Sequence, residues 1–289
     1  RCKAGLTLSQ GVIERRAPAQ AKVDHPTRED VMTIYGTVRS TRRLSPSMVR
    51  IEFDGAGLDD FEPSDATDQY VNALFVPDGA PYSVPFDLEE ARGAGADARP
   101  HGRRFTIRAW DPARRVLTMD FVAHGDVGYA GRWAQRARPG DRLQMTGPSG
   151  KFRPDLTADW HLFVGDESAL PGIAASLDVL PVGARAVALM VVDGAECEIE
   201  LVSAAEVDVH WIHRETCADP DTVLSGAVAA LDWADGRVDV FVHGEAGEVR
   251  AVRQHLLAER GIDRAPASIS PYWRRDHTDE AWRAIKKQW

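Results

Sequence analysis

The sequence has few cysteines and no long hydrophobic run. Its three cysteines, Cys2, Cys197 and Cys217, form no Cys-x-x-Cys pair. An odd number at wide spacing argues against a disulfide framework and against a zinc site, and it is typical of a protein of the reducing cytoplasm. No stretch of about eighteen apolar residues occurs, so we expect no membrane span. Residues 1–28 are polar and lack the apolar segment of a signal peptide, so we expect a flexible extension over residues 1–30.

The chain has no excess of positive charge, because 44 Asp and Glu residues outnumber 35 Lys and Arg residues. The net charge is −9 and the pI is about 5.5. A protein that binds nucleic acid usually has a basic surface, so this balance argues against that class. Ser168 does not lie in a Gly-x-Ser-x-Gly motif, which argues against a serine hydrolase. Hydrophobic residues make up 44% of the chain, which is enough to form hydrophobic cores and argues against disorder as the main state.

The first half of the chain is rich in strand patterns. Residues 31–41 and 48–53 flank the turn-prone Leu44-Ser45-Pro46-Ser47 and predict a hairpin. About six antiparallel strands with one helix suggest a small barrel, which we place at residues 31–154. The further strands are predicted over 70–76, 103–110, 116–124 and 142–146, the helix over 129–137, and a long surface loop over 79–101.

The pattern changes after Pro154, where strands and helices alternate. This alternation predicts a parallel sheet with helices on its faces, which we place at residues 155–270. Trp282, Ile285 and Trp289 recur at helical spacing, so residues 271–289 are predicted to form a C-terminal helical tail. The expected fold has two domains, an N-terminal antiparallel β-barrel and an α/β parallel-sheet domain. The strands are predicted over 160–165, 185–192, 207–213, 237–243 and 267–270, and the helices over 168–180, 222–233 and 248–260.

The strand at Arg103-Arg104-Phe105-Thr106 carries the most informative motif. Alternate strand residues share one face, so Arg103 and Phe105 point the same way, and Thr106 offers a hydroxyl near the strand end. A cation, an aromatic plane and a hydrogen bond are the contacts that a phosphorylated aromatic cofactor needs. The glycine-rich turn from His124 to Gly128 then leads into a helix whose free N–H groups could receive a pyrophosphate.

A barrel followed by a nucleotide-type α/β domain is the arrangement of flavin reductases that receive a hydride from nicotinamide. Among these, the chain resembles the siderophore-interacting protein family, the FAD-dependent ferric-siderophore reductases of the ferredoxin-reductase superfamily, from about residue 34 to the C-terminus. The resemblance rests on five blocks in the right order: Arg103-x-Phe105-Thr106, His124 through Trp133, Val164 through Pro171, His243 through Ala246, and Ser270 through Arg275.

The resemblance implies a cofactor site. Arg103 would bind the FAD phosphate, Phe105 would stack on or beside the flavin, and Thr106 would contact its N5 edge. The family usually has Tyr at Phe105, and many members read Gly-Pro-Ala-Ser-x-Trp over residues 128–133, where this chain reads Gly-Tyr-Ala-Gly-Arg-Trp. The other residues that we assign to cofactor binding are His124, Gly128, Ala130, Gly131, Trp133, Gly165, Asp166, Glu167, Asp193, His243, Gly244, Glu245, Tyr272 and Trp273.

Two acidic sites allow more than one interpretation. Asp166 and Glu167 follow a predicted strand, and they either face the nicotinamide half or the ribose, or cap the next helix. Asp193 also follows a strand, where an acid accepts ribose hydroxyls and disfavours a 2′-phosphate. It therefore leans toward NADH over NADPH, although Asp193-Gly194 is also a plain turn dipeptide.

The resemblance further implies that NADH or NADPH delivers a hydride to FAD and that the flavin passes single electrons to a bound ferric siderophore, which releases Fe(II). No catalytic side chain and no protein-bound metal is required. A ferredoxin-like protein is an alternative electron donor. The alternative functions are a flavin reductase with another acceptor and a siderophore-binding module without redox function. An anionic ferric chelate needs a locally basic pocket, and the candidates are Arg108, Arg274, Arg275, Lys286 and Lys287.

Overall fold

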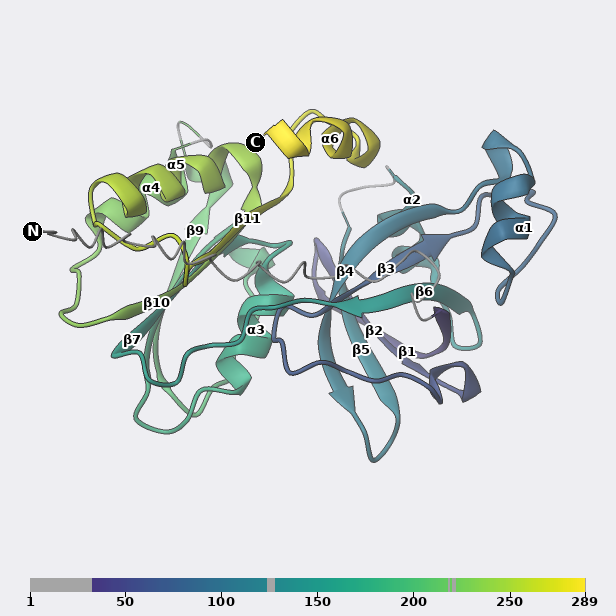
Figure 1. Ribbon diagram of the computed structural model, residues 1–289, viewed down its shortest axis with the longest axis horizontal. Helices are drawn as coiled ribbons and strands as arrows, with labels where there is room; N and C mark the ends of the chain where they lie inside the picture. Colours follow the sequence, from purple (N-terminus) through teal and green to yellow (C-terminus); the bar gives the residue numbers. More distant parts are fainter. Residues whose placement is uncertain (1–32, 124–127, 218, 220–221, 289) are drawn as a thin grey trace, which may run out of the picture. The chain divides into compact units, whose positions relative to one another are not determined.

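The computed structural model of the protein describes residues 33–123, 128–217, 219 and 222–288 (Figure 1). The extension predicted over residues 1–30 and the site residue His124 lie outside the described residues. The described chain belongs to one compact unit. It forms a closed antiparallel barrel, then a parallel sheet with helices and a C-terminal helix, which confirms the expected fold class.

The barrel closes six strands in the order β1-β2-β5-β4-β3-β6. Ser45 of β1 pairs with Met48 of β2, so the hairpin predicted around Pro46 is confirmed. The strand β4, which carries the cofactor motif, lies between β5 and β3. The bounds are β1 Thr33–Ser45, β2 Met48–Asp54, β3 Tyr70–Phe75, β4 His101–Asp111, β5 Val116–Val122 and β6 Arg142–Ser149.

Alternating apolar residues of these strands fill the barrel. Phe53, Met119 and Phe121 are completely buried. Helix α2 (Tyr129–Arg136) packs on this core through Trp133, whose ring stacks on Phe53 with centroids 6.3 Å apart. The barrel core therefore anchors the helix that follows the glycine-rich turn.

The segment 79–101, predicted as a long surface loop, contains a helix. Helix α1 (Leu88–Gly93) begins after Asp87, whose side chain accepts a hydrogen bond from Glu90 N at 2.8 Å. Glu89 and Glu90 in its first turn further stabilise the helix start. The prediction of a continuous loop was wrong here, because a local cap stabilises one short helix within a segment rich in Pro and Gly.

The parallel sheet has the strand order β11-β10-β7-β8-β9. Neighbouring strands all pair in parallel, as the alternation predicts. The chain passes from β7 to β8 on one side of β7, whereas β10 lies on the other side of β7. The strand order therefore reverses between β7 and β10. Open α/β sheets bind ligands at this position, beyond the carboxyl ends of the strands. The bounds are β7 Trp160–Asp166, β8 Arg185–Val192, β9 Glu206–His213, β10 Val238–Glu245 and β11 Ser268–Trp273.

Helices cover both faces of this sheet (Figure 1). Helix α3 (Leu170–Asp178) packs on one face, where Ile173 meets Phe163 and its neighbours. Helices α4 (Val223–Ala230) and α5 (Ala246–Ala258) pack on the other face, in the cluster that contains Val164. Burial on both faces explains why the central strands are continuously apolar.

The C-terminal segment of the chain contacts β4, the strand that carries the cofactor motif. β11 continues through Trp273, beyond the domain boundary expected at 270. Helix α6 (Asp279–Ile285) begins at the cap Thr278 and buries Trp282. Arg283 of α6 donates to the Gly102 carbonyl of β4 at 3.0 Å, so the tail contacts that strand. Among the described residues, no helix is long and apolar enough to cross a membrane.

Candidate functional site

A cavity of about 670 Å³ lies among β4, the carboxyl ends of β7 and β10, β11 and helix α6. It brings together sequence blocks that are far apart along the chain. Its lining includes Arg103, Phe105 and Thr106 from β4, His243 from β10, and Tyr272 and Trp273 from β11.

The β4 motif is held in place from both sides. The ring of Phe105 packs on Phe121 of the barrel core, with centroids 4.5 Å apart. Thr106 is buried, and its side chain hydrogen-bonds with Tyr272. Burial raises the pKa of Tyr272, so its hydroxyl stays protonated at neutral pH. The aromatic wall of the cavity is therefore fixed on one side by the barrel and on the other by β11.

Arg103 is already paired in the structure. Its guanidinium lies 2.8 Å from the Glu280 carboxylate and 3.4 Å from that of Asp279, both on α6, and donates to the Gly102 carbonyl at 2.9 Å. These acids occupy donors that a phosphate would use. A phosphate at this site must therefore share Arg103 with the two carboxylates or displace them.

Cations surround the cavity despite the acidic composition of the chain. Arg104, Lys151, Arg283 and Lys286 line it in addition to Arg103. Lys286 donates to the Pro271 carbonyl at 2.6 Å, and burial, followed by the charge of Arg104, lowers its pKa. Four carboxylates also line the cavity: Asp68, Asp120, Glu167 and Asp279. The cations of the lining therefore exceed its acids by one, whereas the whole chain has a net charge of −9.

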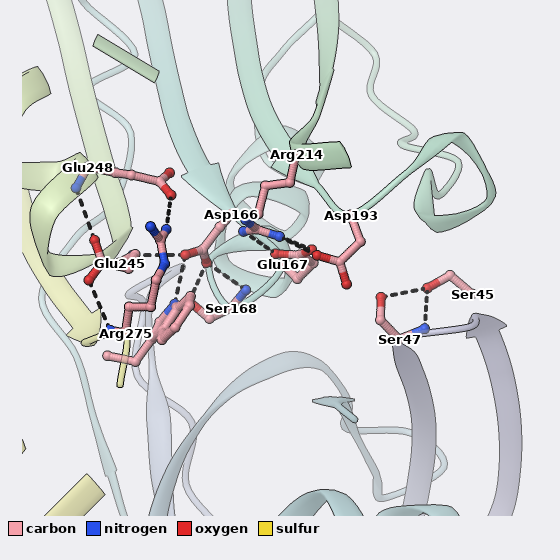
Figure 2. Close-up of polar contacts among 11 residues, drawn as sticks. Ser45, Ser47, Asp166, Glu167, Ser168, Asp193, Arg214, Glu245, Glu248 and Arg275 are labelled. Atoms are coloured by element: carbon pink, nitrogen blue, oxygen red, sulfur yellow. Dashed lines mark hydrogen bonds and ion pairs between the residues drawn. The ribbon is translucent and has the colours of Figure 1, made fainter. Parts of the chain in front are cut away.

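A group of acids, which we call the carboxylate cluster, lies at the strand ends next to the cavity (Figure 2). Its members are Asp166, Glu167, Glu245 and Glu248. Asp166 is completely buried and accepts hydrogen bonds from Glu245 N at 2.8 Å and from Trp273 Nε1 at 2.7 Å. It therefore links β7 to the start of α5 and to the end of β11.

Arg275 holds the part of the carboxylate cluster on α5. Its guanidinium lies 3.1 Å from Glu248, and its backbone N–H donates to Glu245 at 3.0 Å. Burial, followed by the charge of Asp166, raises the pKa of Glu248 to about 8. Glu248 is therefore largely protonated at neutral pH, which reduces the repulsion within the cluster.

Glu167, which follows β7, is fixed by an arginine that follows β9, two strands away in the sheet. Arg214 donates to both Glu167 carboxylate oxygens, at 2.7 and 2.8 Å, and to Asp193 at 2.8 Å. Asp193 is half-exposed at the end of β8, whereas Glu167 is buried. The interpretation that one of these acids caps the next helix was wrong, because the N-cap of α3 is Ala169 and no side chain caps it. Asp166 instead accepts a hydrogen bond from Ser168 N at 2.9 Å in the turn before α3, and Glu167 lines the cavity.

His243 is a buried neutral side chain in this site. Burial, followed by the charge of Lys286, lowers its pKa to about 3. Its Nε2 lies 2.9 Å from the Ser268 hydroxyl. His243 therefore contributes hydrogen-bonding capacity to the cavity wall but no positive charge.

Two glycines bring the strand ends close enough for these contacts. A Cβ at Gly165 would lie 2.7 Å from the His243 carbonyl oxygen, and one at Gly244 would lie 2.7 Å from Asp166. Gly244 also has φ +144°, which a residue with a side chain rarely adopts. Both positions therefore require glycine for steric reasons.

The structure places several other predicted site residues away from the cavity. Trp133 packs in the barrel core. Arg108 pairs with Asp178 of α3 at 2.5 Å and lines a second cavity of about 540 Å³. Arg274 and Arg275 lie beyond the end of β11 and do not line the larger cavity, whereas the predicted residues Ala130 and Glu167 do.

Sequence reasoning missed three of the lining cations, Arg104, Lys151 and Arg283. Arg104 is the variable residue of the β4 motif, and its guanidinium lies over the Tyr70 ring at 5.5 Å from the centroid. Its neighbours in the motif were the signal that could have found it. Lys151 and Arg283 had no motif of their own.

The residues of the cavity fit FAD. Arg103 supplies a cation and Phe105 an aromatic plane, and among the described residues no side chain caps the first turn of α2, which leaves its N–H groups for a phosphate. Trp282 is 2% exposed and lines the cavity, and its indole N–H has no partner among the described residues. A buried unpaired donor is costly, so it suits a ligand with acceptor atoms. No group of metal ligands occurs in the described part of the chain.

Comparison with solved structures identifies the fold. The barrel followed by the parallel sheet is the ferredoxin reductase-like fold. The ferredoxin reductase of carbazole 1,9a-dioxygenase has a TM-score of 0.60 to this chain, at 14% identity, over 84% of this chain and 68% of that one.

The chain belongs to the siderophore-interacting protein family. The family model "Siderophore-interacting FAD-binding domain" matches residues 37–152, and "Siderophore-interacting protein" matches residues 158–276. Ferric vibriobactin reductase of Vibrio cholerae is 30% identical over 83% of this chain and 88% of its own length. An uncharacterized protein of Mycobacterium tuberculosis is 40% identical over 87% of this chain and 93% of its own. A siderophore utilization protein from T. fusca has a TM-score of 0.74 at 31% identity, over 86% of this chain and 95% of that one. The chain is therefore an enzyme of the flavin-dependent reductase class.

Proposed function

We propose that this protein is an FAD-dependent ferric-siderophore reductase that uses NADH or NADPH and acts in the cytoplasm. The main supporting observation is the cavity that joins the β4 motif to the carboxyl ends of β7 and β10. A cofactor held on β4 would face a dinucleotide bound at the point where the strand order reverses. The described cysteines, Cys197 and Cys217, are free thiols, as in a reducing compartment.

The chain's own residues would bind and orient the partners. Bound FAD supplies the redox chemistry, because it accepts two electrons as a hydride and releases them singly. One NAD(P)H would then reduce two ferric ions and release one proton. Arg103 would hold a phosphate, Phe105 would support the flavin ring, and Thr106 would hydrogen-bond at the ring edge. Gly165 and Gly244 leave room for the close approach of the strand ends.

The cationic lining supports a ferric siderophore as the substrate. A ferric complex of a catecholate or carboxylate chelator is anionic, and Arg104, Lys151 and Lys286 line the cavity. These residues, rather than Arg108, Arg274 and Arg275, are in a position to contact a substrate in this cavity. Reduction would release the metal, because such chelators bind Fe(III) far more tightly than Fe(II).

The first test is the absorption spectrum of the purified protein, or of the protein after addition of FAD. We expect a flavin spectrum that NADH bleaches without oxygen and that a ferric catecholate restores, with Fe(II) trapped by a ferrous-specific chelator. The rates with NADH and NADPH identify the donor: Asp193 would accept ribose hydroxyls and favour NADH, whereas Arg214, which pairs with it at 2.8 Å, would favour the 2′-phosphate of NADPH. A protein that bleaches but reduces no ferric chelate has another acceptor. A protein that takes up no FAD is a binding module.

A further inference from the structure

Arg50 and Asp120 form an ion pair between the two cavities. The two residues lie directly opposite each other on β2 and β5. The guanidinium donates to both carboxylate oxygens, from Nε at 2.7 Å and from Nη2 at 2.8 Å. The Asp120 side chain is 1% exposed, and the Arg50 side chain is 24% exposed. The proposed function assigns neither residue a role.

The two residues of this pair line different cavities. Asp120 lines the larger cavity, together with Val122 on the same face of β5 and Phe105 on the neighbouring strand β4. Arg50 does not line this cavity and lines the second cavity of about 540 Å³ instead. The carboxylate therefore belongs to the wall of the proposed flavin site, whereas the cation that compensates its charge reaches it from outside that site.

The charge of Asp120 has a consequence for a flavin in the larger cavity. A flavin that accepts a hydride gains one negative charge, and a carboxylate without a partner in the cavity wall would oppose that gain. Arg50 offsets this repulsion, because its guanidinium is hydrogen-bonded to both carboxylate oxygens. The hydrogen bond to Asp120 also raises the pKa of Arg50, so the cation stays charged.

We propose that Arg50 is a positioning residue that acts on the flavin through Asp120, by holding the carboxylate in place and offsetting its charge at the cavity wall. This inference rests on the proposed function and adds to it the residue pair that sets how readily the bound flavin accepts a hydride. Removal of the cation alone should lower the ratio of the affinities for reduced and oxidised flavin. Two unit charges on the order of 10 Å apart change such a ratio by about 10-fold at an effective dielectric constant of about 20.

The experiment measures the midpoint potential of the bound flavin in the full chain by anaerobic titration against a reference dye, which gives this affinity ratio. We expect Arg50→Gln to lower the ratio by about 10-fold. Asp120→Asn leaves the cation without its acid and should raise the ratio. The double variant has lost both charges and should return to within about 3-fold of wild type. Arg50→Lys keeps the charge but not the two-pronged contact, so it should lower the ratio less than Arg50→Gln does.

Arg39→Gln is a matched control on the same barrel. Arg39 of β1 lies 3.5 Å from Asp54 of β2, but both side chains are exposed, so solvent and salt screen their charges. The affinity ratio should therefore stay at the wild-type value in this variant. Urea unfolding of the apoproteins shows which variants are folded. It should also show that the double variant loses less stability than the two single variants together, because each single variant leaves a charge without its partner.

The outcomes separate this inference from the proposed function. Opposite shifts of the ratio in Arg50→Gln and Asp120→Asn support the inference, because a pair with a purely structural role would shift both variants in the same direction or neither. Shifts in the same direction, or none, overturn it and leave the reductase proposal standing. If Arg50→Gln does not fold or binds no flavin, Asp120→Asn decides, since a wild-type ratio in that variant overturns the inference. A wild type that binds no flavin overturns the proposed function itself.

Discussion

Replacing Glu248 with glutamine is expected to stabilise the protein relative to wild type by an amount that grows as the pH rises from 4.5 to about 8. The side chain is completely buried on α5. Burial, followed by the charge of Asp166, raises its pKa from 4.5 to about 8; Glu245 acts in the same direction, whereas Arg214 and Arg275 oppose it. The folded protein therefore keeps a proton on Glu248 that the unfolded chain releases.

The pKa values of Glu248 in the unfolded and the folded protein determine whether its contribution to stability rises or falls with pH. Between 4.5 and about 8, the folded state binds one more proton at Glu248 than the unfolded state. The stability that this group contributes is complete below the lower value and is lost as the pH rises through the range, by up to about 1.4 kcal/mol per pH unit. Glutamine does not ionise in this pH range, so the variant does not lose this stability as the pH rises. His243, whose folded pKa is lowered, acts in the opposite sense, but it does so in both proteins and cancels in their difference.

The measurement is urea unfolding of both proteins at pH values spaced across this range. The difference in unfolding free energy should rise with pH. Glu62→Gln is a matched control at an exposed carboxylate, and its difference from wild type should stay near zero. Parallel stability curves for Glu248→Gln and wild type would show that Glu248 is ionised in the folded protein.

Replacing Arg103 with alanine is expected to weaken FAD binding by about 10- to 150-fold. A charge-assisted hydrogen bond to a phosphate contributes about 1.5–3 kcal/mol, and the alanine side chain cannot replace it. Titration of apoprotein with FAD, followed by flavin fluorescence, measures the change. Riboflavin has no phosphate, so its affinity should not change. Wild-type flavin occupancy in the variant would show that the assignment of the β4 motif is wrong.

Replacing Glu280 with glutamine should have the opposite effect. Glu280 is 59% exposed and pairs with Arg103 at 2.8 Å, so it competes with a phosphate for the guanidinium. An exposed ion pair contributes little free energy, so its removal should have a small effect on binding. We therefore expect FAD binding to tighten by about 2- to 5-fold. The same titration checks this. Weaker FAD binding in Glu280→Gln would mean that the acid positions Arg103 for the cofactor instead of competing for it.

The hairpin around Pro46 and the alternation after Pro154 show what local patterns can predict. The period of apolar residues reports which face of an element is buried, and this information is local in the sequence. The β4 motif was visible for the same reason, because its residues lie on one strand. Arg108 shows the limit. As a cation it was a candidate for contact with an anionic substrate, but the cavity it lines depends on α3 and Asp178, far along the chain.

Local sequence patterns were enough to predict the order of elements, the barrel and the parallel sheet, the β4 motif and the family, because each pattern or motif involved is short and continuous in the chain. Which charged groups meet depends on the folding of distant segments against one another. Arg103 pairs with the acids of α6, Asp166 receives Trp273, and Glu248 becomes a protonated acid beside Asp166. These partners come from distant segments, and their pKa values depend on burial and neighbouring charge, which no local pattern records.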